Sequence, residues 1–154
     1  MQTKFLRNEF WYGGAVYESY KQPIGEEDSV EWDFRENPTA NQIMPLFLST
    51  KGRYIWSEKG FQIQFHKGMI QAEGDCEILL KEGYDSLRGA YLEAMKQHFP
   101  FHEIRLSKRF FEAPVYNTWI EMTFYQEQNR ILEYARGILE HGLPTGILMI
   151  DDGW

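Results

Sequence analysis

The chain has 154 residues, 43% of them hydrophobic and 16% aromatic, and a formal net charge of −7. This composition is typical of a folded protein with a core of ordinary size, and the acidic balance argues against a surface that binds nucleic acid. No apolar stretch approaches the roughly 20 residues that span a bilayer, so we expect no membrane partner. The first ten residues lack the apolar block of a signal peptide, which slightly favours the cytoplasm as the compartment.

The first half of the chain is typical of an antiparallel β-protein. The segment 9–42 contains the pair Gly13–Gly14 together with Pro23, Gly25 and Pro38, and these residues predict that it is largely loop. From 45 to 81, short apolar runs alternate with turn residues, and "FQIQFH" at 61–66 places its aromatic and aliphatic side chains on one face. We therefore predict a partial β-sandwich over residues 1–83.

The period of the apolar residues changes at Tyr84. "YDSLRGAYLEAMKQHFP" predicts a helix with Asp85 or Ser86 as N-cap and Pro100 as its stop, and we assign 84–113 to a connector. His98 and His102 have metal-ligand spacing, but the proline between them breaks the helix that would align them, so no metal is expected. The single cysteine lies at position 76 in a strand-like run and is expected to be a buried structural thiol.

Residues 114–154 have the pattern of a βαβ unit. "VYNTWIEM" at 115–122 predicts a strand, Thr123 to Gln126 matches a capping box that opens a helix, and Gly142 with Pro144 ends that helix. The unbroken apolar run "GILMI" then predicts a second, parallel strand. Because parallel strands end on the same side of a sheet, Glu121 and the residues from Asp151 to Trp154 are expected to share one rim, where α/β proteins bind ligands.

The segments "PVYNTW" and "MIDDGW" resemble the opening of the catalytic barrel of glycoside hydrolase family 31, the α-glucosidase and α-xylosidase family. The upstream "EFWYGGAVYES", "IMPLFLSTKGRYIWS" and "LRGAYLEAMKQHFP" resemble the end of that family's β-sandwich and its linker. The resemblance implies a sandwich, a connector and the first βαβ unit of a (β/α)8 barrel, within an N-terminal fragment of a longer enzyme.

The resemblance also implies which residues act. Family members hydrolyse α-glucosides or α-xylosides with retention, need no cofactor, and take their nucleophile and acid/base from later barrel strands, so we expect no catalytic residue in this chain. The position of Asp151 binds sugar hydroxyls in the family. Trp154 as an aromatic wall, Trp119 and Glu121 are further substrate-binding candidates, although a core position is favoured for Trp119.

Several alternatives stay open from the residues alone. Asp-Asp-Gly at 151–153 is also typical of a simple turn, and the segment Trp11 to Gly14 departs from the family's glycine-rich loop. Asp151 and Glu121 are a possible pair of catalytic carboxylates, which the family resemblance disfavours. The alternative function is a non-catalytic carbohydrate-binding or scaffold domain. For a partial barrel we also expect self-association through its exposed edges.

Overall fold

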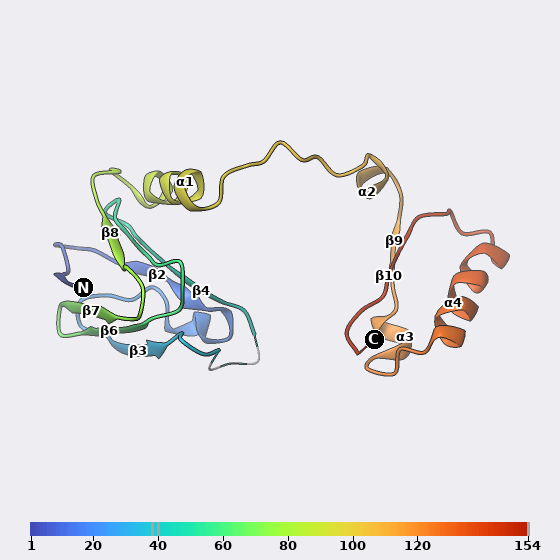
Figure 1. The fold of residues 1–154 in the computed structure, drawn as a ribbon, viewed down its shortest axis with the longest axis horizontal. Coiled ribbons are helices and arrows are strands. Elements are labelled where there is room, and N and C mark those ends of the chain that lie inside the picture. Colours follow the sequence, from blue (N-terminus) through green and yellow to red (C-terminus); the bar gives the residue numbers. More distant parts are fainter. Residues whose placement is uncertain (38, 40, 154) are drawn as a thin grey trace. The chain divides into compact units, whose positions relative to one another are not determined.

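The computed structural model describes residues 1–37, 39 and 41–153. The chain forms two compact units, Met1–Phe101 and His102–Trp154 (Figure 1). The boundary between them falls inside the segment 84–113 that the sequence analysis assigns to a connector. The first unit is built mainly from strands and the second from helices and a short parallel pair.

Two four-stranded antiparallel sheets form the first unit. The first has the order β1-β7-β6-β3 and the second the order β2-β4-β5-β8. The strands of the first sheet are β1 (Gln2–Lys4), β3 (Ser29–Asp33), β6 (Gln62–His66) and β7 (Met69–Glu73). Those of the second are β2 (Trp11–Ala15), β4 (Ile43–Ser49), β5 (Tyr54–Trp56) and β8 (Leu79–Lys81).

The two sheets share an aromatic core. Phe47 on β4 is fully buried, and its ring centroid lies 5.5 Å from that of Phe65 on β6 and 5.8 Å from that of Trp32 on β3. Ile63 and Phe65 are buried while the intervening Gln64 points outward, as the alternation of "FQIQFH" predicts. The antiparallel strands predicted between 45 and 81 are confirmed, and the arrangement is consistent with a β-sandwich.

The prediction that 9–42 is largely loop holds only in part. This segment contains β2, a short 3-10 helix η1 (Val16–Lys21) and β3. Gly13 and Gly14 do not form a turn, because they lie within β2 at a register shift opposite β4. Gly13 has a φ of 146°, and a Cβ there would overlap the main-chain oxygen of Leu46, so only glycine fits this bulge.

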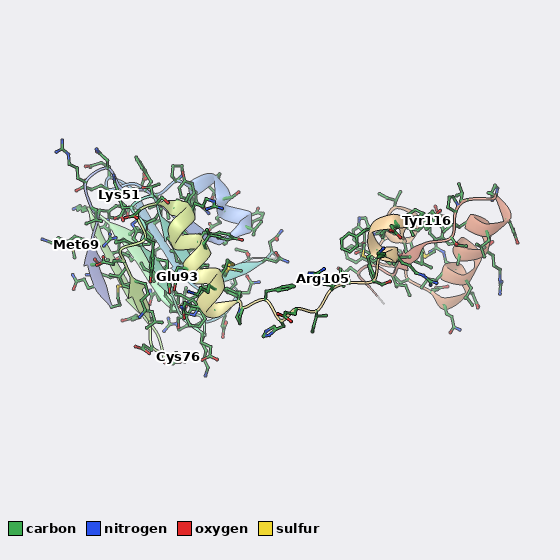
Figure 2. All side chains as sticks on the ribbon, turned by 90° about the horizontal axis from the view of Figure 1, so that it is seen from above. Lys51, Met69, Cys76, Glu93, Arg105 and Tyr116 are labelled. Atoms are coloured by element: carbon green, nitrogen blue, oxygen red, sulfur yellow. The ribbon has the colours of Figure 1, made fainter. Side chains whose placement is uncertain are left out.

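The predicted helix is α1 (Leu87–His98), and it packs on the outer face of the second sheet (Figure 2). Ser86 is its N-cap, with a side chain that accepts a hydrogen bond from the backbone N–H of Gly89 at 3.1 Å. Ala90 and Ala94 are fully buried against Leu46 and Tyr54 of the sheet. The small alanines allow the helix to lie close to the strands, so this helix is an integral part of the first unit.

The second unit contains the predicted parallel pair. Strands β9 (Val115–Asn117) and β10 (Ile147–Met149) run parallel, with Ile147 opposite Val115 and Met149 opposite Asn117. Two short helices, α2 (Arg109–Glu112) and α3 (Trp119–Met122), flank β9, and α4 (Gln128–Glu140) connects the strands. The predicted order of strand, helix and parallel strand is therefore confirmed, while a complete barrel is not formed by the residues that the structure describes.

Two local predictions in this unit are wrong. The strand ends at Asn117 rather than continuing through Met122, because the Asn117 side-chain oxygen accepts the backbone N–H of Trp119 at 2.6 Å and turns the chain into α3. The capping box from Thr123 to Gln126 does not form. Thr123 has a φ of 51°, its hydroxyl donates to the carbonyl of Met122, and α4 begins only at Gln128.

Candidate functional site

Asp151 lies just beyond β10, beside the end of the neighbouring strand β9. Parallel pairing places Met149 opposite Asn117, so the residues that follow both strands meet at the same edge. The backbone N–H of Thr118 donates to the carbonyl of Met149 at 3.2 Å, which extends the pairing by one residue. The expected common rim therefore exists at Asp151, with Asn117 and Thr118 as its neighbours.

Three hydrogen bonds fix Asp151 in this position. The Asn117 side-chain amide donates to Oδ2 of Asp151 at 2.6 Å, and the backbone N–H of Asp152 donates to Oδ1 at 2.8 Å. The backbone N–H of Asp151 itself donates to the hydroxyl oxygen of Thr118 at 3.1 Å. Because Thr118 is fully buried, the backbone of Asp151 is attached to the interior of the second unit.

These contacts also set the charge of the group. The hydrogen bond from the Asp152 backbone, followed by that from the Asn117 amide, lowers the pKa of Asp151 below its usual value. Asp151 is therefore ionised at neutral pH and suited to accept hydrogen bonds rather than to donate a proton. A carboxylate has about four lone-pair positions, and two of them remain for hydroxyl groups of a ligand.

The chain after Asp151 turns closely past another segment of the unit. Gly153 has a φ of 93°, and a Cβ there would lie 2.6 Å from the main-chain oxygen of Phe124. The chain bends at Asp152, and the left-handed φ at Gly153 with this close approach requires a glycine there. Trp154, the candidate aromatic wall, lies outside the described residues.

Trp119 lies one residue past Thr118, at the start of α3. It is half-buried, and its ring packs edge-on against that of Phe124 with the centroids 4.9 Å apart. Its backbone N–H is held by Asn117, the residue that also binds Asp151. Asn117 therefore joins Asp151 to the start of α3, and Trp119 combines a packing contact with a position beside the candidate site.

Glu121 is exposed on α3 and not at the end of a strand, which corrects the sequence analysis. It lines a depression of about 250 Å³ together with Met122, Arg130, Glu133 and Tyr134. Arg130 donates to the backbone carbonyl of Glu121 at 3.3 Å. The pair of catalytic carboxylates was inferred from two adjacent strand ends, and Glu121 lies on α3 and not at the end of β9, so this basis for pairing it with Asp151 is removed.

Other residues singled out from the sequence lie in the first unit. Trp11 is fully buried and, with Tyr12 and the glycine pair, forms β2 rather than a loop. His98 stacks on Trp56 with the ring centroids 3.8 Å apart. Cys76 is half-buried outside the strands, and not fully buried in one as expected (Figure 2).

Asn117 and Thr118 are the members of the site that the sequence analysis missed. They follow Val115 and Tyr116 along the chain, and a polar pair at the end of a parallel strand is a signal for a binding rim. The signal was hidden because the apolar residues Trp119, Ile120 and Met122 extended the predicted strand past its true end.

Neither cofactors nor relatives identify the site. In the described ranges no three His, Cys, Asp or Glu side chains are grouped so that they could hold a metal ion, and none of the described helices is long and apolar enough to cross a membrane. The sequence matches no known family model and no curated protein. A functional assignment therefore depends on the geometry around Asp151.

Proposed function

We propose that this chain is the N-terminal part of a retaining α-glycosidase of glycoside hydrolase family 31. In this proposal the first unit is the enzyme's β-sandwich, and the second contributes the first strand, helix and second strand of a (β/α)8 barrel. The observation that carries the proposal is the ionised carboxylate of Asp151 at the end of the second parallel strand, held by Asn117 from the end of the first. The carboxyl ends of barrel strands are where such enzymes bind substrate.

Asp151 would bind the sugar whose bond is broken. Its free lone pairs would accept hydrogen bonds from hydroxyl groups, and bonds to an ionised acceptor are stronger than neutral ones. Contacts of this kind assist catalysis when they strengthen as the oxocarbenium-like transition state forms. Asn117 and Thr118 are positioning residues, because the Asn117 amide holds the carboxylate of Asp151 and the Thr118 hydroxyl holds its backbone N–H.

The exposed apolar surface of the second unit also supports a larger barrel. Taken by itself, this unit exposes apolar side chains on both of its strands and on α3, including 91% of Ile120. Further strands and helices of a barrel would cover such surfaces. Retaining hydrolysis needs a nucleophile and an acid/base, and both would come from later barrel strands, so the 154-residue chain is expected to be inactive by itself.

The experiment is to read the coding sequence past the codon for Trp154 and to assay the encoded protein. The proposal expects six further strand-helix repeats, turnover of 4-nitrophenyl α-glucoside or α-xyloside with retention of the α-anomer, and no turnover by residues 1–154 alone. A stop codon, combined with sugar binding by the 154-residue chain, would instead establish the non-catalytic carbohydrate-binding domain. Turnover by the 154-residue chain would contradict the assignment of roles.

A further inference from the structure

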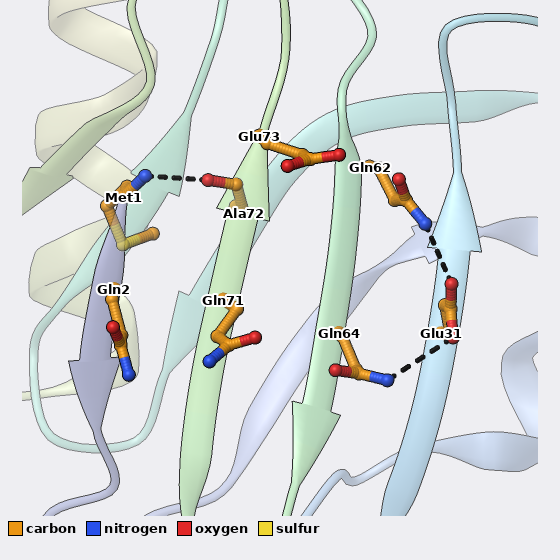
Figure 3. Close-up of a pocket in the computed structure, with 8 residues that line it drawn as sticks. All are labelled: Met1, Gln2, Glu31, Gln62, Gln64, Gln71, Ala72 and Glu73. Carbon is orange, nitrogen blue, oxygen red and sulfur yellow. Dashed lines mark hydrogen bonds between the residues drawn. The ribbon is translucent and has the colours of Figure 1, made fainter.

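A row of amide side chains crosses the outer face of the first sheet. Strand pairing places Gln2 opposite Gln71, Gln71 opposite Gln64, and Gln64 opposite Glu31, so all four strands contribute one residue (Figure 3). Directly opposed side chains lie about 5 Å apart in a sheet. The row is thus a regular series of hydrogen-bonding groups from β1 to β3.

Glu31 organises one end of this row. Its Oε1 accepts a hydrogen bond from the Gln62 amide at 2.7 Å, and its Oε2 accepts one from the Gln64 amide at 3.3 Å. Because the Gln64 amide nitrogen is directed to Glu31, its carbonyl oxygen faces Gln71 (Figure 3). The oxygens of Gln64 and Gln71 thus point toward the same place on the face, where they are available to a hydroxyl donor.

The row lines a shallow depression of about 530 Å³. Its described lining is Met1, Gln2, Glu31, Gln62, Gln64, Gln71, Ala72 and Glu73. The one cation in this described lining is the N-terminal ammonium of Met1, which donates to the carbonyl of Ala72 at 2.6 Å, and the two carboxylates of Glu31 and Glu73 outweigh it, which argues against an anionic ligand. None of these side chains is aromatic, which argues against a flat apolar ligand. The carboxylates of Glu31 and Glu73 belong to no group of three potential metal ligands in the described part of the chain.

We propose that this amide row is a binding site for a neutral, polyhydroxylated chain such as an oligosaccharide. Each glutamine offers two donors and a carbonyl acceptor, and neighbouring hydroxyl groups on a sugar require such pairs. The site does not rest on the proposed glycosidase function, because it lies in the first unit and shares no residue with the surroundings of Asp151. It would hold a saccharide without acting on it.

The test uses the full 154-residue chain, labelled with nitrogen-15, and maltopentaose as the probe. The side-chain amide signals of Gln64 and Gln71 are expected to shift saturably, with a dissociation constant on the order of 1 mM because the contacts are exposed hydrogen bonds. The double variant Gln64→Ala/Gln71→Ala should weaken binding by about tenfold or more. Gln97→Ala, which alters an exposed glutamine on α1, is the matched control and should bind as the wild type does.

The outcomes separate this inference from the proposed function. Asp151→Asn should leave these shifts unchanged, whatever it does to catalysis in a longer protein. The backbone amide signals of β6 and β7 verify that the double variant keeps its sheet. The inference is overturned by the absence of saturable shifts up to about 20 mM maltopentaose, by binding that the double variant does not weaken, or by shifts that calcium chloride produces and the saccharide does not.

Discussion

Replacing Arg53 with methionine is expected to lower the free energy of unfolding of the first unit by about 3–5 kcal/mol, because it leaves a buried carboxylate without its partner. Arg53 on the turn before β5 and Glu9 before β2 are only 3% and 2% exposed. The guanidinium donates to both carboxylate oxygens of Glu9, and its Nη2 also donates to the carbonyl of Lys4 at 2.9 Å. Through its bond to Lys4 of β1, Arg53 connects the second sheet to the first.

The size of the expected loss of stability follows from the contacts that Glu9 keeps in the Arg53→Met variant. Burial by itself raises the pKa of Glu9, but the hydrogen bonds from Arg53 and Ser49 more than offset it, so the pKa is lower than usual. Without Arg53, burial is opposed only by Ser49 and the backbone N–H of Leu6. The loss of the guanidinium from above the Trp11 ring, 5.2 Å from its centroid, adds a smaller cost.

The assay is urea unfolding followed by tryptophan fluorescence at pH 7 and at pH 4. Because an unpaired buried carboxylate becomes protonated as the pH falls, the difference between wild type and Arg53→Met should narrow towards pH 4. The double variant Glu9→Gln/Arg53→Met is the matched control and should recover at least about 1 kcal/mol, since no charge is left unpaired. A loss below about 1 kcal/mol in the single variant, or a double variant no more stable than the single, would refute this reasoning.

Three further predictions concern the two units. Desolvation, with a smaller contribution from Lys81, lowers the pKa of His98 in the folded protein. The unfolded chain therefore binds a proton at this residue at a higher pH than the folded chain does, and the free energy of unfolding should fall as the pH drops below about 6.5. Urea midpoints measured between pH 7.5 and 5.5 should fall less for His98→Gln than for the wild type. Gly13→Ala should lower the free energy of unfolding of the first unit by about 1–3 kcal/mol, because the new methyl group would overlap the backbone of β4. Gly137→Ala, where the space around the glycine is open, should stabilise α4 by about 0.5–1 kcal/mol. Sedimentation velocity should show concentration-dependent self-association that Ile120→Asp reduces; a monodisperse wild type would contradict this.

Much of the fold could be predicted because its periodicity is local. The alternation in β6 indicates which face is buried, the apolar run of β10 predicts a strand, and Ser86 with Pro100 marks the ends of α1. The strand β2 could not be predicted in the same way. Its glycine pair has the composition of a turn, and only the close approach to Leu46 on β4 explains why glycine occurs inside a strand.

The candidate site could be predicted in position but not in detail. A carboxylate after an apolar parallel strand places Asp151 at a sheet edge from sequence alone. Its partner Asn117 could not be found, because the end of β9 is set by a side-chain hydrogen bond to Trp119 and not by the apolar pattern. Glu121 was misplaced for the same reason. Where a polar side chain competes for backbone groups, the pattern of apolar residues does not define the boundary of an element.

The most direct test of the proposed glycosidase uses the protein encoded by the coding sequence that continues past the codon for Trp154. Its kcat/KM on 4-nitrophenyl α-glucoside and α-xyloside is measured for the wild type, Asp151→Asn and Asp152→Asn. Both substitutions remove one carboxylate, but only Asp151 is held by Asn117, while Asp152 is exposed. The account predicts a fall on the order of 100-fold for Asp151→Asn with little change in thermal unfolding, and activity close to wild type for Asp152→Asn. Equal activity of the two variants would contradict the proposal that Asp151 binds the sugar, and would favour the interpretation of Asp151 as a turn residue.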